Sequence, residues 1–245
     1  MSERIEKIFG LAIFIFFCTV YFLTETSAIQ QNNLFSRRVR ENEVVFREGG
    51  FRFEARAGQG AETASHILQK ALFLENHWSV STPEYGPAQS GSPMRVHIRT
   101  ANQQIIDRSY VEEPDWLIIF SGSLLEELGE NLFSGLKSNG ILLLNTGYRE
   151  DIGYLNLLPP PSEEQKFYYI PARDIASEVI GTERGENVVM LGALVRVTKL
   201  IKLSSLLEAI RSHLSEKLKL PPAVVEKNVR AARRGYEEVR VYSKP

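Results

Sequence analysis

The chain has 245 residues, which is enough for a sizeable hydrophobic core in one or two domains. Hydrophobic residues make up 43% and charged residues 24%, as in ordinary globular proteins, and the net charge of −1 gives no reason to expect nucleic acid as a partner. The single cysteine, Cys18, excludes a disulfide within the chain, an iron–sulfur cluster held by cysteines and an all-cysteine zinc site. The four histidines form no HxH or HExxH pair, so we expect no metal site.

An uncharged apolar run, residues 8–23 (IFGLAIFIFFCTVYFL), lies near the start of the chain. Its length is at the short end of the roughly 17–25 residues that span a bilayer. Three interpretations are open: a signal peptide, a single membrane anchor, or an extension in front of a soluble protein. Arg4 and Lys7 precede the run, and four arginines follow it, which favours an anchor with a cytoplasmic body behind it. We therefore divide the chain into an apolar segment (1–27), a linker (28–50) and a body (51–245).

The body opens with a strand, a glycine-containing turn and a helix. Residues 51–56 alternate apolar and charged side chains, as on a half-buried strand, and apolar residues then recur at helical spacing over residues 64–72. Gly58 and Gly60 lie where the strand gives way to the helix. Backbone N–H groups at such a helix start can receive a phosphate, and glycines allow close approach. The same pattern is also found in a tight βα connection that binds nothing.

Strands and helices alternate through the rest of the body. Strands are predicted at 78–82, 94–100, 104–109, 116–120, 141–144 and 166–172, with a short one at 43–46; helices are predicted after Ser121 or Ser123 as cap, and at 173–181, 187–201, 204–218 and 222–239. Residues 83–93 and 158–165 are rich in Pro, Gly or Ser and predict loops. The continuously apolar strands predict a sheet covered on both faces. The fold class is therefore α/β: a three-layer α/β/α domain with C-terminal helices, preceded by an N-terminal apolar helix.

Several motifs occur in an order that is typical of one enzyme family. The turn ARAGQG (55–60) matches the family sequence GRGGQG, and the loop YGPAQSGSP (85–93) corresponds to YGPExRGAP. The segments EPDWLIIF, GLKSNGILLLNT, NVVMLGAL and VVEKNVRAARRGYE follow in the same order. From about Phe51 to Tyr236 the chain resembles the gamma subunit, or gamma domain, of the 2-oxoacid:ferredoxin oxidoreductases, most nearly the pyruvate type.

The resemblance implies a role in oxidative decarboxylation of pyruvate, or a close 2-oxoacid, to acetyl-coenzyme A or its counterpart. It implies alpha, beta and delta-type partner subunits that carry the thiamine diphosphate and the iron–sulfur clusters, with electrons passing to ferredoxin. The gamma part would close over the active site and help to receive coenzyme A, with no catalytic residue of its own. The residues expected to contact coenzyme A are Arg56, Gly58, Gln59, Gly60, Tyr85, Gly86, Pro87, Gly91 and Asn187.

Each of the polar residues in that set also has an interpretation without a ligand. Arg56 could be a solvated arginine at a strand end, and Gln59 could support the loop backbone. Tyr85 could pack under its own loop, and Asn187 is most simply the N-cap of the buried helix. Glu62 suits the helix dipole but would repel a phosphate, so it must point away from any anion site at this turn. The basic residues of the last helix predict a solvated face or a subunit contact: Lys227, Arg230, Arg233 and Arg234.

The sequence also departs from the family pattern. Ala55 and Ala57 replace glycines, which strains the backbone only if the local φ is positive. Ala88–Gln89–Ser90 replaces a charged pair, which weakens any anion site that used its arginine. These departures and the apolar run favour an alternative: a non-catalytic, membrane-anchored gamma-like module that binds a nucleotide or a partner protein. The motifs keep the order that they have in the family, which opposes this alternative. We therefore expect an accessory subunit of the oxidoreductase.

Overall fold

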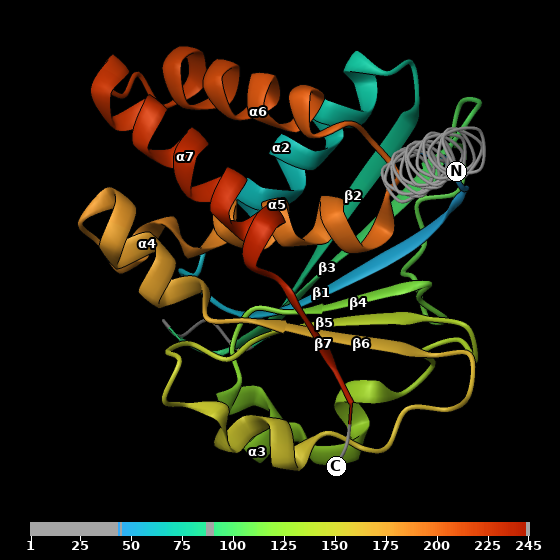
Figure 1. Ribbon diagram of the computed structural model, residues 1–245. Helices are drawn as coiled ribbons and strands as arrows, with labels where there is room; N and C mark the ends of the chain where they lie inside the picture. Colours follow the sequence, from blue (N-terminus) through green and yellow to red (C-terminus); the bar gives the residue numbers. More distant parts are fainter. Residues whose placement is uncertain (1–43, 45, 87–90, 244–245) are drawn as a thin grey trace, which may run out of the picture. The chain divides into compact units, whose positions relative to one another are not determined.

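A single mixed sheet organises the protein, whose structure is a computed structural model that describes residues 44, 46–86 and 91–243. Its strands lie in the order β2-β3-β1-β4-β5-β6-β7 (Figure 1). They are β1 (Gly49–Arg56), β2 (Trp78–Tyr85), β3 (Pro93–Ala101), β4 (Trp116–Ile119), β5 (Ile141–Asn145), β6 (Lys166–Ile170) and β7 (Arg240–Tyr242). Strands β1, β4, β5 and β6 are parallel, whereas β3 is antiparallel to β1 and β2, and β7 is antiparallel to β6.

Helices cover both faces of this sheet. They are α2 (Ala61–Leu74), α3 (Ser123–Leu128), α4 (Ala172–Ile180), α5 (Glu186–Thr198), α6 (Leu203–Ser212) and α7 (Pro222–Glu238). Short 3₁₀ helices occupy Gly129–Phe133, Ile152–Leu157 and Glu183–Gly185, and a π-helical turn, His213–Lys217, follows α6. Figure 1 shows α2, α4, α5, α6 and α7 on one face of the sheet and α3 on the other. The predicted three-layer α/β class with C-terminal helices is confirmed.

The sheet separates two hydrophobic clusters. Phe51 and Phe53 of β1 pack with α2, α5, α6 and α7 in the larger cluster, whereas Leu124 and Leu125 of α3 lie in the smaller one. Strand β4 contributes to both, with Trp116 and Ile118 on one side and Leu117 and Ile119 on the other. Its continuously apolar sequence follows from this position, because a strand covered on both faces has no side that meets water.

The structure corrects three of the predicted elements. Residues 104–109 form no strand; side chains hold this segment instead, since Arg99 donates hydrogen bonds to the Ser109 and Tyr110 carbonyl oxygens. Residues 83–85, predicted as loop, belong to β2, where Pro83 is accommodated because β2 is an edge strand and has a neighbour on one side only. Val44 and Phe46 lie outside any strand, so the short strand predicted at 43–46 is also wrong for these residues.

The predicted apolar N-terminal helix, residues 8–23, lies outside the described residues. Among the residues that are described, no helix combines the length and the apolar character needed to cross a bilayer. Whether the run is an anchor, a signal or an extension therefore stays a prediction from sequence. The expected start of the body is shifted only slightly, because β1 begins at Gly49.

Candidate functional site

The site lies at the carboxyl ends of the parallel strands. After β1 the chain passes to α2 on one face of the sheet, and after β4 it passes to α3 on the opposite face. Neighbouring parallel strands whose connections leave to opposite faces open a crevice at their carboxyl ends, which is where open α/β sheets bind ligands. The turn singled out in the sequence, between Arg56 and Gly60, lies at this crevice.

The turn itself depends on two glycines. Gly58 has φ 98° and Gly60, the N-cap of α2, has φ 77°. A side chain on Gly60 would also collide with Asn187, whose Nδ2 lies 2.7 Å from the position of a Cβ. Ala55 and Ala57 are not among the described residues with positive φ, so the family glycines that they replace are not needed here for conformation.

A buried polar network joins the turn to the other strands. Glu186, at the start of α5, accepts a hydrogen bond from Asn145 Nδ2 at 3.0 Å and another from Arg173 Nε at 3.1 Å. Gln59 Nε2 donates to its second oxygen at 3.4 Å, while Gln59 Oε1 accepts from the backbone N–H of Arg56. Asn145 follows directly on the hydrophobic part of β5, and its Oδ1 accepts backbone N–H bonds from Gly147 and Ala172. The network thus links β1, β5, α4 and α5.

Glu186 is the charged centre of this network. Its side chain is 7% exposed, and burial raises the pKa of the carboxyl above its ordinary value. Arg173 and Asn145 act in the opposite direction, because both stabilise the ionised carboxylate. A buried carboxylate that is paired and hydrogen-bonded in this way can persist at a ligand pocket without a large folding penalty.

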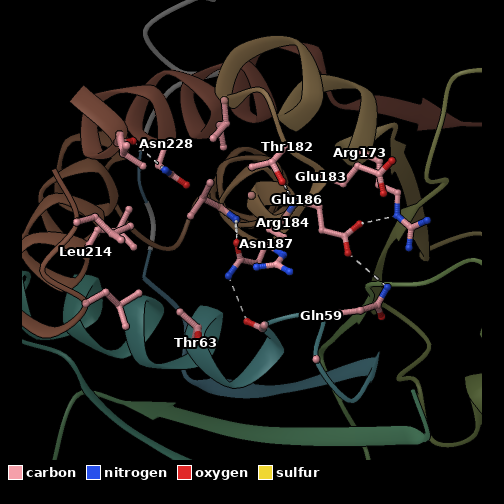
Figure 2. A pocket seen from close by; sticks show the side chains of 18 residues that line it. Gln59, Thr63, Arg173, Thr182, Glu183, Arg184, Glu186, Asn187, Leu214 and Asn228 are labelled. Carbon is pink, nitrogen blue, oxygen red and sulfur yellow. Dashed lines mark hydrogen bonds and ion pairs between the residues drawn. The ribbon is translucent and has the colours of Figure 1, made fainter. Parts of the chain in front are cut away.

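A pocket of about 630 Å³ opens next to the turn (Figure 2). One wall consists of Gly58, Gln59, Gly60 and Thr63, and the opposite wall consists of the segment 182–188. The remaining lining comes from the C-terminal part of the chain: Leu214, Leu218, Leu220, Val224 and Asn228, with Arg173 and Ile180 from α4. Figure 2 shows Gln59 reaching across to Glu186, so the network forms part of the pocket surface. The volume of the pocket is within the range of small-molecule and cofactor sites.

The charges in this pocket are not all neutralised. Arg173 is paired with Glu186, and Glu183 accepts a hydrogen bond from the Tyr148 hydroxyl. Arg184 is exposed and makes no ion pair with any residue described by the structure. Its charge is therefore available to an anionic ligand in this pocket.

Arg56 points away from this pocket. Its Nε donates to Ser123 Oγ at 2.9 Å, its Nη1 donates to the Gly91 carbonyl oxygen at 3.1 Å, and its Nη2 pairs with Glu127 at 2.7 Å. Arg56 thus connects the end of β1 to α3 and to the loop that follows β2. It is neither a solvated arginine nor part of the large pocket's lining.

The predicted second loop lies beside the turn but does not line the large pocket. The Tyr85 hydroxyl donates to Glu62 at 2.9 Å, and this bond raises the pKa of the Tyr85 phenol. Gly91 N–H donates to the Ala57 carbonyl oxygen at 3.3 Å. Among the described residues, neither Tyr85, Gly86 nor Gly91 appears in the pocket lining, and Pro87 lies outside the described residues.

Two capping predictions are wrong. The N-cap of α5 is Gly185, and Asn187 lies inside the first turn, where its Nδ2 donates to the Gly60 carbonyl oxygen at 3.4 Å. The N-cap of α3 is Gly122, which offers no side chain, while Ser121 and Ser123 hydrogen-bond to each other. The structure therefore brings Asn187 to the turn through a tertiary contact instead of a cap, and its role toward a ligand stays a prediction.

Three residues of the network were not identified from the sequence: Asn145, Arg173 and Glu186. A polar residue directly after a buried strand is a usable signal for Asn145, since strand ends at this edge carry ligand-binding groups. For Arg173 and Glu186 no such signal exists, because their roles depend on how α4 and α5 meet.

Comparison with known proteins places this geometry in a family. The family model for pyruvate ferredoxin/flavodoxin oxidoreductase matches residues 50–238. The chain belongs to this family. The pyruvate synthase subunit PorC of Thermotoga maritima is 37% identical over 77% of this chain and 93% of its own length. The common gamma subunit of the pyruvate and ketoisovalerate oxidoreductases of Pyrococcus furiosus is 35% identical over 78% of this chain and 97% of its own length.

Solved structures agree with the family assignment. The crystal structure of the pyruvate oxidoreductase subunit PORC from Thermotoga maritima matches with a TM-score of 0.63 at 34% identity, over 80% of this chain and 99% of that one. A 2-oxoglutarate:ferredoxin oxidoreductase from Magnetococcus marinus matches with a TM-score of 0.61 over 79% of this chain and 31% of that one. At 18% identity the latter likeness concerns the fold alone. The resemblance inferred from the motifs is confirmed.

Proposed function

We propose that this chain is the gamma subunit of a pyruvate-type 2-oxoacid:ferredoxin oxidoreductase, a multi-subunit enzyme that converts pyruvate to acetyl-coenzyme A. The observation that carries the proposal is the match to gamma-type relatives over almost their whole length. The single cysteine fits an accessory role, because iron–sulfur clusters need several cysteine ligands and must then lie on partner chains. Thiamine diphosphate, the clusters and the contact with ferredoxin are assigned to alpha, beta and delta-type subunits.

We assign the coenzyme A contribution of this chain to the large pocket. The glycine turn and the start of α2 provide one wall, with backbone N–H groups that suit a phosphate. Arg184 supplies an available cation on the other wall, and the leucines of the π-helical turn and its neighbours supply apolar surface. Residues Gly58, Gln59, Gly60 and Asn187 of the predicted set meet here. Arg56, Tyr85, Gly86, Pro87 and Gly91 remain predicted contacts through the adjacent loop.

The choice of the 2-oxoacid is assigned to the partner subunits. The relative from Pyrococcus furiosus is named as a subunit common to the pyruvate and ketoisovalerate oxidoreductases. A chain shared between two such enzymes cannot be the part that distinguishes their substrates. By analogy, we expect this chain to tolerate pyruvate and branched 2-oxoacids equally.

Copurification from the native source tests the proposal. A tagged chain should bring down partner subunits with thiamine and iron, and the complex should reduce ferredoxin with pyruvate and coenzyme A. The chain alone should show no turnover and no bound iron. A chain that never assembles with an oxidoreductase, or that turns over pyruvate by itself, would contradict the assignment.

Localisation stays a prediction from the N-terminal charges. The arginines after the apolar run favour a cytoplasmic body. Membrane association has no support from the described residues. Fractionation of cells that express the full chain, beside a variant lacking residues 1–30, separates the two locations.

A further inference from the structure

A second, smaller cavity lies at the carboxyl ends of β4 and β5. Its volume is about 90 Å³, which admits a small ion but not a nucleotide. Its lining includes Ser121, Ser123, Thr146, Asp151 and Arg173. The Thr146 hydroxyl already donates to the Ile170 carbonyl oxygen at 3.3 Å. Arg173 also lines the large pocket, so it forms part of the wall between the two.

Arg173 is held so that part of its guanidinium remains for a ligand. Its Nε is fixed by Glu186 at 3.1 Å, and its guanidinium carbon lies 6.0 Å from the centre of the Tyr148 ring. Its backbone N–H donates to the Gly147 carbonyl oxygen at 3.1 Å, which anchors the residue at the edge of the cavity. A guanidinium carries five N–H donors. Glu186 takes the Nε donor, a side-chain hydrogen bond joins Arg173 to Tyr148, and the Glu183 carboxylate also attracts the guanidinium, so that some but not all of the Nη donors remain for a ligand. The side chain is 35% exposed, so these donors are accessible.

The two serines continue the hydrogen-bonded chain that starts at Arg56. Arg56 Nε donates to Ser123 Oγ at 2.9 Å, and Ser123 Oγ lies 2.9 Å from Ser121 Oγ. If Ser123 donates its proton to Ser121, the Ser121 hydroxyl is free to donate to a ligand. An anion in the cavity selects this orientation, because each bond in such a chain polarises the next.

We propose that the small cavity is a subsite for an oxyanion, held by the Nη donors of Arg173 and by the Ser121 hydroxyl. The ligand group is a phosphate or a carboxylate, because both match the forked donors of arginine. The subsite rests on this geometry alone and does not depend on the proposed function. Asp151 opposes it, since an exposed carboxylate in the lining repels an anion and lowers the affinity.

Titration calorimetry on the full chain tests the subsite, with inorganic phosphate and pyruvate as separate probes at constant ionic strength. Arg173→Gln should weaken binding by about 10- to 150-fold, the loss expected for a hydrogen bond to a charged group. Arg173→Lys should lie in between, because it keeps the charge and loses the fork. Tighter binding of phosphate would indicate a phosphate-bearing ligand, and tighter binding of pyruvate a carboxylate.

Asp151→Asn gives the test with the opposite sign. Removing this carboxylate should tighten binding of both probes, and the exposed position makes a folding defect unexpected. Arg230→Gln is the matched control, because it removes one positive charge from an exposed position on α7. Arg184→Gln distinguishes binding in the two pockets, since it should weaken the binding of an anion only if that anion lies in the large pocket.

Three results would overturn the subsite. They are no binding of either probe to the wild-type chain, a dissociation constant unchanged by Arg173→Gln in a folded variant, and binding weakened by Asp151→Asn. If Arg173→Gln does not fold, because Glu186 loses its cation, the Asp151→Asn result still decides. Assembly and turnover of the complex test the proposed function separately. The binding constants measured on the chain alone do not depend on the result of that test.

Discussion

Arg56 and Arg184 differ in whether the charge of the side chain is already engaged within the protein. Arg56 is the arginine of the family turn, yet its guanidinium is engaged by Ser123, Gly91 and Glu127. Arg184 belongs to no motif recognised in the sequence, yet it lines the large pocket without an ion pair among the described residues. We therefore expect Arg184, and not Arg56, to bind a phosphate of coenzyme A.

Arg184→Gln should lower the coenzyme A affinity of the assembled complex by about 10- to 150-fold, through loss of a charge-assisted contact of about 1.5–3 kcal/mol. The fold should be unaffected, since the side chain is exposed. The measurement is the dissociation constant of coenzyme A, with Arg230→Gln as the charge-matched control. Equal affinities for the Arg184 and Arg230 variants would remove Arg184 from the site. If Arg56→Ala lowered the affinity for coenzyme A and Arg184→Gln did not, the phosphate contact would belong to Arg56.

Glu186 is the residue at which pH and stability are coupled. Burial raises the pKa of its carboxyl in the folded protein above the unfolded value of about 4.3. The folded state therefore holds the proton more tightly than the unfolded state. Its contribution to stability is fully present below about pH 4.3 and is lost as the pH rises through the folded-state pKa.

Glu186→Gln should remove this pH dependence. The free energy of unfolding of the wild-type protein, minus that of the variant, should fall as the pH rises above about 4.3 and then level off. Urea unfolding of both proteins between about pH 4 and about pH 8 measures the difference. Glu54, whose pKa is also raised by burial, is present in both proteins and cancels. A difference that is constant across this range would mean that Arg173 and Asn145 balance the effect of burial, and a difference that grows with pH would mean that they outweigh it.

At the scale of elements, α5 and α7 pack through two glycines. A Cβ on Gly192 would lie 1.8 Å from the Ala232 carbonyl oxygen, and a Cβ on Gly235 would lie 2.1 Å from the Val189 carbonyl oxygen. Both obstacles are backbone atoms, which cannot move unless the helices separate. The close approach positions the candidate site, since α5 carries Glu186 and Asn187 to the turn.

Gly192→Ala should destabilise the protein by at least the upper part of the roughly 1–3 kcal/mol that overpacking costs. Gly153→Ala is the matched control, because nothing lies within 4 Å of its Cβ position and its φ is not positive. That variant should change the free energy of unfolding by no more than about 0.5 kcal/mol. Chemical unfolding of the three proteins gives the comparison. Similar stabilities for both variants would mean that the α5–α7 contact adjusts easily.

At the scale of the whole molecule, Val44–Pro245 forms a compact unit of its own. Of the described residues before Gly49, none belongs to a strand; Phe46 packs against the larger cluster and stacks on His77, and Arg47 lies over the Trp116 ring. A unit with its own core can fold independently of a preceding segment. The apolar run at 8–23 is therefore expected to serve location and not folding.

Deletion of residues 1–30 should leave a soluble protein that unfolds cooperatively. Its free energy of unfolding should equal that of the longer chain within about 0.5 kcal/mol, because the unit Val44–Pro245 keeps its own core. Circular dichroism during thermal and urea unfolding is the measurement, with detergent added to both samples as the control for the apolar run. A truncated protein that aggregates, or that loses its cooperative transition, would show that the run contributes to the fold.

The sequence by itself determined the elements and the family. Alternation and helical spacing located β1, α2 and the three C-terminal helices, and continuously apolar runs located β4 and β5. The half-buried character predicted for β1 is wrong, since Arg52 and Glu54 are buried and paired with each other. The motif order identified the family from Phe51 to Tyr236. Periodicity failed at residues 104–109, where side-chain bonds replace a strand ladder, and at 83–85, where an edge position tolerates proline.

The tertiary structure alone decided the site. Gln59 and Glu186, which hydrogen-bond to each other, are 127 positions apart in the sequence. Asn145 and Glu186, which also hydrogen-bond, are 41 positions apart. Local patterns encode which residues form a helix or strand, but not which helix starts meet which strand ends. That depends on the face of the sheet to which each connection passes and on the close α5–α7 contact. The same arrangement directs Arg56 toward α3 and leaves Arg184 and Arg173 with donors for a ligand. The partners of a side chain depend on distances in space, and the spacing of residues along the sequence does not determine these distances.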